Sequence, residues 1–260
     1  MMCKLCSAVA VPFARARVLA KYDVDYYQCQ DCGFVQTEEP YWLDEAYSQA
    51  ITDSDLGLVS RNLSLATITR AAITMFFKSD AQFVDYGGGY GLFVRLMRDH
   101  GFDFYRYDKF CANLFAPGFD IDPQGGKRYE LLTAFEVFEH LASPLDEIAH
   151  MLGLSNSILF STMVIPARNP HPDEWWYYGL EHGQHVALYT RKSLELFAAK
   201  LHLNLYSNGL SLHLLTSRKI SSLAFNIVTR GRVAEALRTF SGGRSRLADD
   251  YYQITGRHLG

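Results

Sequence analysis

Four of the five cysteines form two pairs, and in each pair two residues separate the thiols. A short turn of this kind presents two thiolates to one tetrahedral ion, and two such turns complete a shell of four sulfurs. The 22 residues between the pairs are enough for a hairpin that joins the two turns. We therefore predict a structural zinc site, closed to further ligands, made by Cys3, Cys6, Cys29 and Cys32. The alternatives are ordinary buried thiols and a redox pair, although a redox pair has no use for the second pair.

A run of glycines follows a short apolar segment, Phe83-Val84-Asp85-Tyr86, and precedes a helical pattern that starts at Leu92. The run is Gly87-Gly88-Gly89-Tyr90-Gly91. Glycines let the backbone pass close to a ligand, and the N-terminus of the next helix presents free N–H groups. The following strand ends at Asp108, 21 residues after Gly87, where a carboxylate can take both hydroxyls of a ribose. The arrangement predicts a nucleotide site.

The glycine spacing distinguishes between kinds of nucleotide. A dinucleotide fingerprint that starts at Gly87 needs glycine where Leu92 stands, and one that starts at Gly88 fails at Tyr90. The remaining pattern, preceded by Asp85, suits a ligand with one nucleoside and an amino-acid tail. An NAD-dependent sugar oxidoreductase stays as the alternative that the spacing disfavours.

A histidine-rich segment lies between Pro166 and Tyr189, just beyond the end of an apolar strand. Ligands of α/β sheets bind at this end of the strands, and neutral histidine is a natural base near pH 7. We predict His182 as a general base with Glu181 as its partner and His185 in reserve. Two alternatives are that these side chains only pack the loop, and that three histidines bind a metal; the distance of His171 in sequence disfavours the second.

The elements that position these residues alternate between helix and strand. Hydrophobic spacing predicts strands at 83–86, 102–107, 129–137 and 158–165, with a closing hairpin of 203–206 and 212–217. Helices are predicted at 57–78, 92–100, 143–154 and 190–201, and in the tail at 221–240 and 244–252. The alternation predicts an α/β fold with a mostly parallel sheet, to which the hairpin adds one antiparallel strand.

From about residue 57 to 219 the chain resembles the class I S-adenosylmethionine-dependent methyltransferases. The resemblance rests on DYGGGYG, on Asp108, on AFEVFEHL after the third clear strand, and on the final hairpin. It implies a seven-stranded Rossmann-like sheet and S-adenosylmethionine as the cofactor. By position it implies a glycine loop under the methionine part, a ribose contact at the second strand end, an adenine contact and a methionine-side lining. These residues are Asp85, Gly87, Gly88, Gly89 and Gly91; Asp108 with Lys109; Phe119 and Asp120; and Ala134, Phe135 and Glu136.

The cysteine module ahead of this fold is also similar to a narrower group, the bacterial sugar C-methyltransferases. Those enzymes use a Tyr-x-Glu-His stretch for substrate deprotonation, and here Tyr178-Gly179-Leu180-Glu181-His182 is one residue longer. The whole chain resembles more closely methyltransferases found with surface-polysaccharide genes. The resemblance implies methyl transfer to a small acceptor, which we expect to be a sugar nucleotide or a surface-glycan precursor.

Composition sets the remaining expectations. The 260 residues are 48% hydrophobic with a net charge of −3, which favours a folded chain and gives no field suited to nucleic acid. No apolar run is long enough to span a membrane, the N-terminus lacks a signal peptide, and free cysteines indicate a reducing compartment, so we expect a cytoplasmic protein. We predict a zinc-ribbon module at 1–40, a methyltransferase domain at 41–219 and a basic helical tail at 220–260. A non-catalytic module that binds a macromolecule through the ribbon and tail is the third alternative.

Overall fold

The computed structural model describes residues 1–48, 55–237 and 243–259. Two compact units share the chain. The first consists of Met1–Thr52, Phe135–His150 and Phe160–Arg218, and the second of Asp53–Ala134, Met151–Leu159 and Lys219–Gly260. Within the described ranges, no helix has the length and apolar character needed to cross a bilayer.

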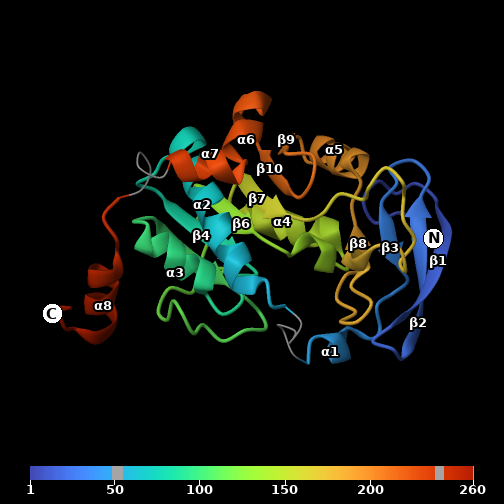
Figure 1. Ribbon diagram of the computed structural model, residues 1–260, viewed down its shortest axis with the longest axis horizontal. Coiled ribbons are helices and arrows are strands. Elements are labelled where there is room, and N and C mark those ends of the chain that lie inside the picture. Colours follow the sequence, from blue (N-terminus) through green and yellow to red (C-terminus); the bar gives the residue numbers. More distant parts are fainter. Residues whose placement is uncertain (49–54, 238–242, 260) are drawn as a thin grey trace. The chain divides into compact units, whose positions relative to one another are not determined.

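The first unit contains a small antiparallel sheet (Figure 1). Its strands in the described residues are β1 (Ala10–Val18), β2 (Tyr22–Cys29), β3 (Val35–Thr37) and β8 (Ala187–Leu188), in the order β1-β2-β3-β8. β1 and β2 form the hairpin expected between the two cysteine turns. β8 falls in the segment predicted as a loop; a strand of two residues is too short to show a period in the sequence. A short helix, α1 (Leu43–Ala46), follows the sheet.

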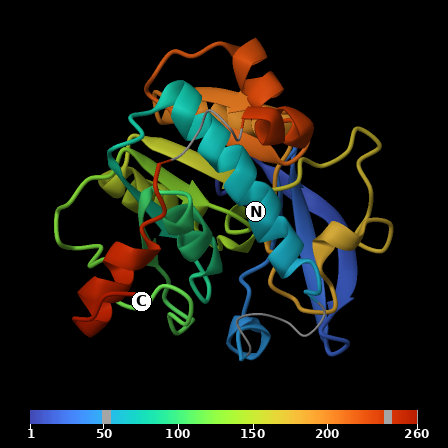
Figure 2. The ribbon, with the colours of Figure 1, turned by 60° about the vertical axis from the view of Figure 1, so that its left-hand side comes forward.

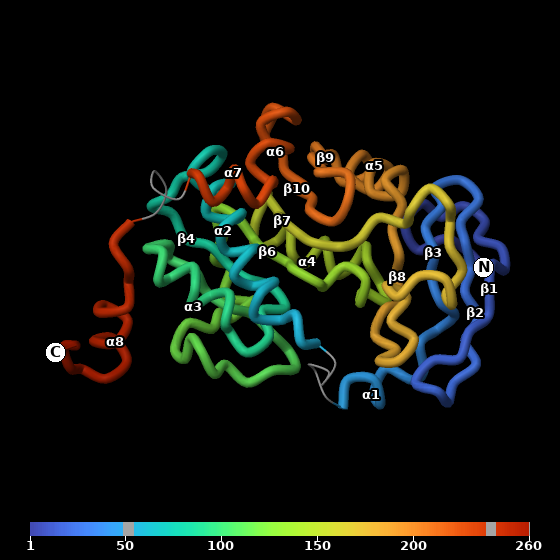
Figure 3. The backbone as a smooth tube through the Cα atoms, in the orientation of Figure 1, coloured from blue at the N-terminus to red at the C-terminus, as the bar shows by residue number. Residues whose placement is uncertain are grey.

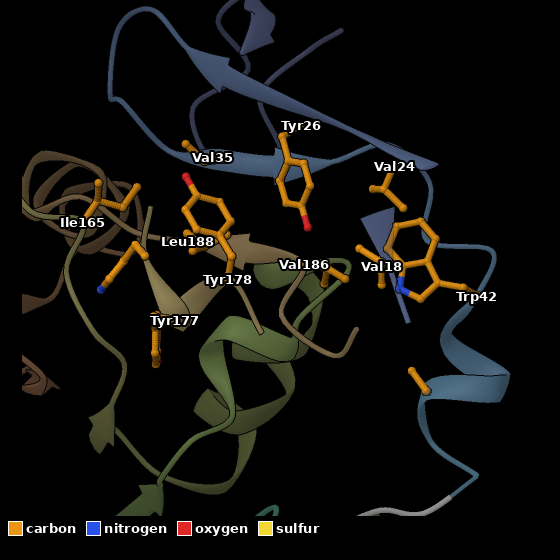
Figure 4. Close-up of a cluster of buried hydrophobic side chains, with 12 residues drawn as sticks. Val18, Val24, Tyr26, Val35, Trp42, Ile165, Tyr177, Tyr178, Val186 and Leu188 are labelled. Carbon is orange, nitrogen blue, oxygen red and sulfur yellow. The ribbon is translucent and has the colours of Figure 1, made fainter. Parts of the chain in front are cut away.

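Aromatic side chains fill the core beside this sheet (Figure 4). Tyr26 of β2 meets Tyr178 edge to face with their ring centroids 5.4 Å apart. The indole N–H of Trp42 donates to the carbonyl of Gly183 at 2.8 Å. Three of the four consecutive aromatics at 175–178 are therefore core residues, whereas Trp176 is 72% exposed. This packing holds the histidine-rich segment in one conformation.

Six described strands make the larger sheet, in the order β5-β4-β6-β7-β10-β9. They are β4 (Gln82–Tyr86), β5 (Asp103–Tyr107), β6 (Leu131–Ala134), β7 (Ser157–Ser161), β9 (Asn204–Ser207) and β10 (Leu212–Thr216). β4 pairs in parallel with β5 and β6, and the closing hairpin of β9 and β10 is antiparallel. The predicted α/β class with its antiparallel hairpin is confirmed.

The predicted count of seven strands is wrong for the described residues. The segment before Asp120 makes only a one-residue parallel bridge, between Arg106 and Asp120. Pro117 lacks an N–H, and Gly118 has a φ of +82°, so an extended run cannot form there. β6 is also shorter than the predicted 129–137, because the chain turns at Glu136, whose φ is +53°. β7 likewise ends at Ser161, short of the predicted residue 165.

The helices lie close to their predicted bounds. They are α2 (Leu58–Phe76), α3 (Leu92–Asp99), α4 (Pro144–Leu154), α5 (Arg191–Lys200), α6 (Ser222–Val228), α7 (Gly231–Ala236) and α8 (Leu247–Thr255), with 3-10 turns η1 (Phe138–His140) and η2 (Trp176–Tyr178). In the second unit α2 contacts α3, α6 and α7 (Figure 2). The predicted helix at 221–240 is instead two helices, because the chain breaks after Thr229 and restarts at Gly231; residues 238–240 lie outside the described part.

α8 is anchored to the second unit through a buried cluster of charges. Asp250 of α8 pairs with Arg98 of α3 at 2.6 Å and with Arg95 at 2.9 Å. Arg98 also pairs with Asp103 at 2.8 Å and is 1% exposed. A buried guanidinium needs such partners because its desolvation is costly. The end of the basic tail therefore belongs to the folded part of the second unit.

Candidate active site

The glycine loop connects β4 to α3 in the second unit. Gly87, Gly89 and Gly91 have φ values of +70°, +52° and +86°, which side chains with a Cβ rarely adopt. The N–H groups of Gly87 and Gly88 donate to the carbonyl of Tyr107 at 2.8 and 3.2 Å, so the loop is fixed to the end of β5. Gly91 is the N-cap residue of α3. The sequence prediction of a strand, a glycine turn and a helix is thus observed.

Two positions of the loop leave no space for a side chain. A Cβ on Gly88 would lie 2.8 Å from Oδ2 of Asp85, and a Cβ on Gly91 would lie 2.5 Å from Oδ1 of Asn113. Both distances are shorter than a real carbon contact, so larger residues would displace the loop. Four of the five loop residues are glycines and Tyr90 carries the remaining side chain, which suits a ligand that approaches the backbone closely. These features fit an adenosyl cofactor with an amino-acid tail.

Asp108 follows β5 and faces the glycine loop. Its Oδ2 accepts a hydrogen bond from the N–H of Gly89 at 2.9 Å. Its Oδ1 accepts from the N–H groups of Phe110 and Cys111, each at 2.7 Å. Three backbone donors therefore fix the carboxylate beside the loop, and Oδ2, which accepts only one of them, retains a lone pair for a further donor. The chain from Asp108 to Arg128 has neither helix nor regular strand and runs as an irregular loop (Figure 3).

Asp85 lies under the glycine loop and is buried. The hydroxyl of Thr133 donates to its Oδ1 at 2.6 Å. Burial is the main cause that raises the pKa of Asp85, and the charge of Asp108 acts in the same direction. The hydrogen bond from Thr133 and the charge of Arg106 lower it, and the net pKa is about 7. Asp85 therefore supports the loop from within and titrates near neutral pH.

The residues expected near adenine have other partners. Phe119 is buried, and the guanidinium of Arg98 lies 3.6 Å from its ring centroid. Asp120 pairs with Arg106 at 2.9 Å, and Arg106 in turn lies 4.0 Å from Asp108. Lys109 is exposed beside Asp108. An adenine contact from Phe119 or Asp120 stays a prediction.

The segment after β6 passes from one unit to the other. Ala134 ends β6 in the second unit and is fully buried, and Phe135 is half-buried in the first unit. The carboxylate of Glu136 accepts from the hydroxyl of Ser161 at 2.6 Å, and the same hydroxyl accepts from the N–H of Glu136 at 2.8 Å. Ser161 thus holds Glu136 in its left-handed conformation. A role for these three residues beside the methionine part stays a prediction.

The first unit brings together His140, His182 and His185. The ring centroids of His140 and His185 are 4.9 Å apart, and those of His182 and His185 are 4.8 Å apart. Glu181 is exposed and forms no hydrogen bond or ion pair among the residues that the structure describes, so it does not orient His182 here. His171 is also exposed, and its ring lies against Phe13. The structure therefore places His140, from η1, in the cluster instead of His171.

The hydrogen bonds of the two predicted bases differ. Nδ1 of His182 accepts from the N–H of Gln184 at 3.2 Å, which places the proton of a neutral ring on Nε2. Nδ1 of His185 lies 2.5 Å from the carbonyl of Tyr177 and must donate to it, which leaves the lone pair on Nε2. Burial lowers the pKa of His185 to about 4 and that of His140 well below its ordinary value. The rings of His140 and His185 are therefore neutral at pH 7.

Glu139 is the member of this cluster that sequence reasoning missed. It is 0% exposed, and both of its carboxylate oxygens lack a hydrogen-bond partner among the described residues. Burial, and after it the neighbouring charge of Glu136, together raise its pKa to about 8. Its position next to His140, directly after a strand, was the indication available in the sequence.

The four paired cysteines lie together in the first unit. The printed sulfur separations are 3.7 Å for Cys3 and Cys32, 3.4 Å for Cys6 and Cys29, and 3.6 Å for Cys6 and Cys32. A tetrahedral ion with metal–sulfur bonds of about 2.3 Å requires sulfurs roughly 3.8 Å apart, so the four thiols fit one metal ion. The hydroxyl of Thr190, the N-cap of α5, donates to the carbonyl of Cys32 at 2.6 Å and ties the second turn to that helix.

The chain was compared with curated proteins, with solved structures and with protein-family models. A search of curated proteins finds no match. Among solved structures, the chain is similar to the plantazolicin methyltransferase BpumL in complex with SAH (13% identity, 68% of this chain and 96% of that chain covered, TM-score 0.47). It is also similar to CalO1, a methyltransferase in calicheamicin biosynthesis, in its SAH-bound form (17% identity, 68% of this chain and 60% of that chain covered, TM-score 0.46). A third similar structure is an O-methyltransferase family protein from Burkholderia thailandensis (12% identity, 63% of this chain and 57% of that chain covered, TM-score 0.44).

The family model for a methyltransferase domain matches residues 61–208, more than half of the chain. The match includes the glycine loop, Asp108, the segment after β6 and the histidine cluster. The chain belongs to this methyltransferase-domain family.

Proposed function

We propose that this enzyme methylates a small-molecule acceptor, a sugar nucleotide or a surface-glycan precursor. The observation that supports the cofactor half of the proposal is the glycine loop with the Asp108 carboxylate fixed beside it. The acceptor class rests on the resemblance of the cysteine module and the histidine-rich segment to those of sugar and polysaccharide methyltransferases. Trp176 adds one exposed aromatic ring in that segment, a surface on which a sugar can stack.

The glycine loop and Asp108 bind different parts of the cofactor. The loop accommodates the methionine part through Gly87 to Gly91, with Ala134 of the same unit as its further lining. Asp108 accepts the ribose hydroxyls, with Lys109 beside it, and Phe119 and Asp120 lie on the adenine side. When bound, S-adenosylmethionine supplies the methyl group: its S–CH₃ bond breaks, a bond from that carbon to the acceptor atom forms, and the neutral thioether leaves.

Methylation of a hydroxyl or an acidic C–H also releases one proton, which the chain must accept. Of the two histidines expected as bases, His185 has its Nε2 lone pair available, whereas His182 uses its Nδ1 lone pair for the N–H of Gln184. We therefore assign the proton acceptor to this pair and prefer His185 to His182 as the base. Glu181 contributes only its charge. General-base assistance of this kind contributes about 10²- to 10⁴-fold to the rate.

The cysteine cluster holds a structural zinc ion in this proposal. Four sulfur ligands leave no position for substrate, so the ion does not take part in methyl transfer. Both cysteine turns contact α5. The turn of Cys29 and Cys32 accepts a hydrogen bond from Thr190, and the ammonium of Lys200 donates to the carbonyl of Leu5, in the other turn, at 3.3 Å. The ion thereby stabilises the first unit.

The experiment is an incubation of the purified protein with methyl-labelled S-adenosylmethionine and a panel of nucleotide sugars, followed by mass spectrometry. We expect one product heavier by a methyl group. His185→Ala should reduce its formation by at least about 100-fold, in line with the loss of a general base. His171→Ala, which removes an exposed histidine of the same segment, is the control and should react at the wild-type rate. If the protein binds the cofactor but forms no methylated nucleotide sugar, the proposed acceptor class is wrong. If the His185 variant is fully active, the assignment of His185 as the base is wrong.

A further inference from the structure

Glu139, His140 and His185 bring one carboxylate and two imidazoles together in a buried place, and packing alone does not explain such a cluster. One carboxylate oxygen and one nitrogen from each ring lie within 4.8 Å of one another. Buried carboxylates are normally hydrogen-bonded, yet neither oxygen of Glu139 has a partner in the described part of the chain. An uncompensated buried charge costs several kcal/mol, so a group in this position needs a cation or a proton.

The hydrogen bonds of the two histidines allow both rings to present a lone pair toward Glu139. The carbonyl of Tyr177 takes the Nδ1 proton of His185, so the lone pair of its Nε2 stays available. Nδ1 of His140 lies 3.0 Å from the hydroxyl of Tyr47, which can accept the Nδ1 proton and leave Nε2 of His140 deprotonated. A backbone or side-chain oxygen that fixes the far nitrogen of a ring is the arrangement typical of metal-binding histidines.

We propose that Glu139, His140 and His185 bind one divalent transition-metal ion, separate from the ion of the cysteine cluster. Two imidazole nitrogens and one carboxylate oxygen suit manganese, iron, cobalt or zinc in the divalent state. Three protein ligands leave coordination positions open, as in catalytic and not structural metal sites. This further step rests on the proposed function and changes the part of His185 in it: with Nε2 on the ion, His185 is a ligand and not the base. An acceptor hydroxyl at an open position is then more acidic and releases its proton to water.

The probe is Mn²⁺, because thiolates bind it weakly and the cysteine cluster then does not compete. Protein that retains one zinc ion per chain after dialysis is titrated with MnCl₂, and free Mn²⁺ is followed by electron paramagnetic resonance. We expect one bound ion per chain, and Glu139→Gln should weaken its binding by at least about 100-fold, because even residues behind a ligand change metal affinity by 10- to 100-fold. Glu174→Gln removes an exposed acid of the histidine-rich segment and should bind as the wild type does.

A second variant and a second ligand keep the outcomes apart. Glutamine has the shape of glutamate and removes a buried charge, so Glu139→Gln should fold, and His185→Gln should lose the ion as well. If wild type and Glu139→Gln bind Mn²⁺ equally, or if wild type binds S-adenosylhomocysteine but no Mn²⁺, the metal site is refuted while the proposed function stands. If Mn²⁺ binding depends on Glu139 but no methylated product forms, the metal site stands and the proposed function fails.

Discussion

The buried carboxyl of Asp85 gives the glycine loop a measurable pH dependence. Asp85 lies beneath Gly88 and accepts a hydrogen bond from Thr133. The perturbation is Asp85→Asn, which keeps the size of the side chain and the acceptor for Thr133 but cannot ionise. We expect this variant to become more stable than the wild type as the pH rises.

The sign and size follow from the linkage between proton binding and folding. Burial raises the pKa of Asp85 to about 7 in the folded chain, whereas its ordinary value is 3.8. Between these values the folded chain keeps a proton that the unfolded chain has released, so wild-type stability falls as the pH rises through this window. The fall is complete above about pH 7. Between pH 5 and pH 8 it amounts to about 2–3 kcal/mol, which Asp85→Asn does not lose.

The assay is urea unfolding followed by circular dichroism at several pH values from 5 to 8. The difference in unfolding free energy between variant and wild type should widen across this range, since the contributions of all other groups cancel. Asp122→Asn removes an exposed carboxyl from the loop after β5, and its curve should run parallel to that of the wild type. Parallel curves for Asp85→Asn and wild type would refute the assignment of Asp85 as a buried, weakly acidic group.

Three further predictions concern the cysteine cluster, the tail and the loop. Cys29→Ser should abolish bound zinc in atomic absorption and lower the unfolding free energy by several kcal/mol; full zinc content would contradict the site. Asp250→Ala leaves buried Arg98 with fewer partners and should cost about 2–4 kcal/mol in urea unfolding and expose α8 to trypsin; an unchanged midpoint would show that the pair contributes nothing. Gly91→Ala meets both a φ of +86° and the side chain of Asn113, so we expect a loss of about 1–3 kcal/mol and weaker S-adenosylhomocysteine binding by calorimetry, and wild-type values of both would contradict the close approach.

The sequence predicted the features that depend on local pattern. The glycine turn between β4 and α3, the hairpin of β9 and β10, and the capping of α5 by Thr190 all follow from residue types within a few positions. The cluster of the four cysteines could also be predicted, because the spacing of the two pairs alone implies that the four sulfurs lie close together. The α/β class followed from the alternation of these local patterns.

The features that sequence reasoning missed depend on contacts between distant residues. β8 exists because Ala187 pairs with Gln36 across the chain, and two residues carry no period. Glu139 is an acid next to a histidine, a combination usually found at the surface, and its burial comes from the elements packed around η1. The base prediction at His182 failed to anticipate the N–H of Gln184, because hydrogen bonds in an irregular loop leave no pattern in the sequence. The boundaries predicted at residues 40 and 219 stay predictions.

The central claim is that the glycine loop and Asp108 bind an adenosyl cofactor with an amino-acid tail. Isothermal titration of the purified protein with S-adenosylhomocysteine and with NAD⁺ tests it most directly. We predict one site per chain for S-adenosylhomocysteine, no binding of NAD⁺, and a loss of about 10- to 100-fold in affinity for Asp108→Asn, because a hydrogen bond to a charged group contributes about 1.5–3 kcal/mol. Binding of NAD⁺ in place of S-adenosylhomocysteine, or equal affinity of the folded Asp108→Asn variant, would contradict the claim.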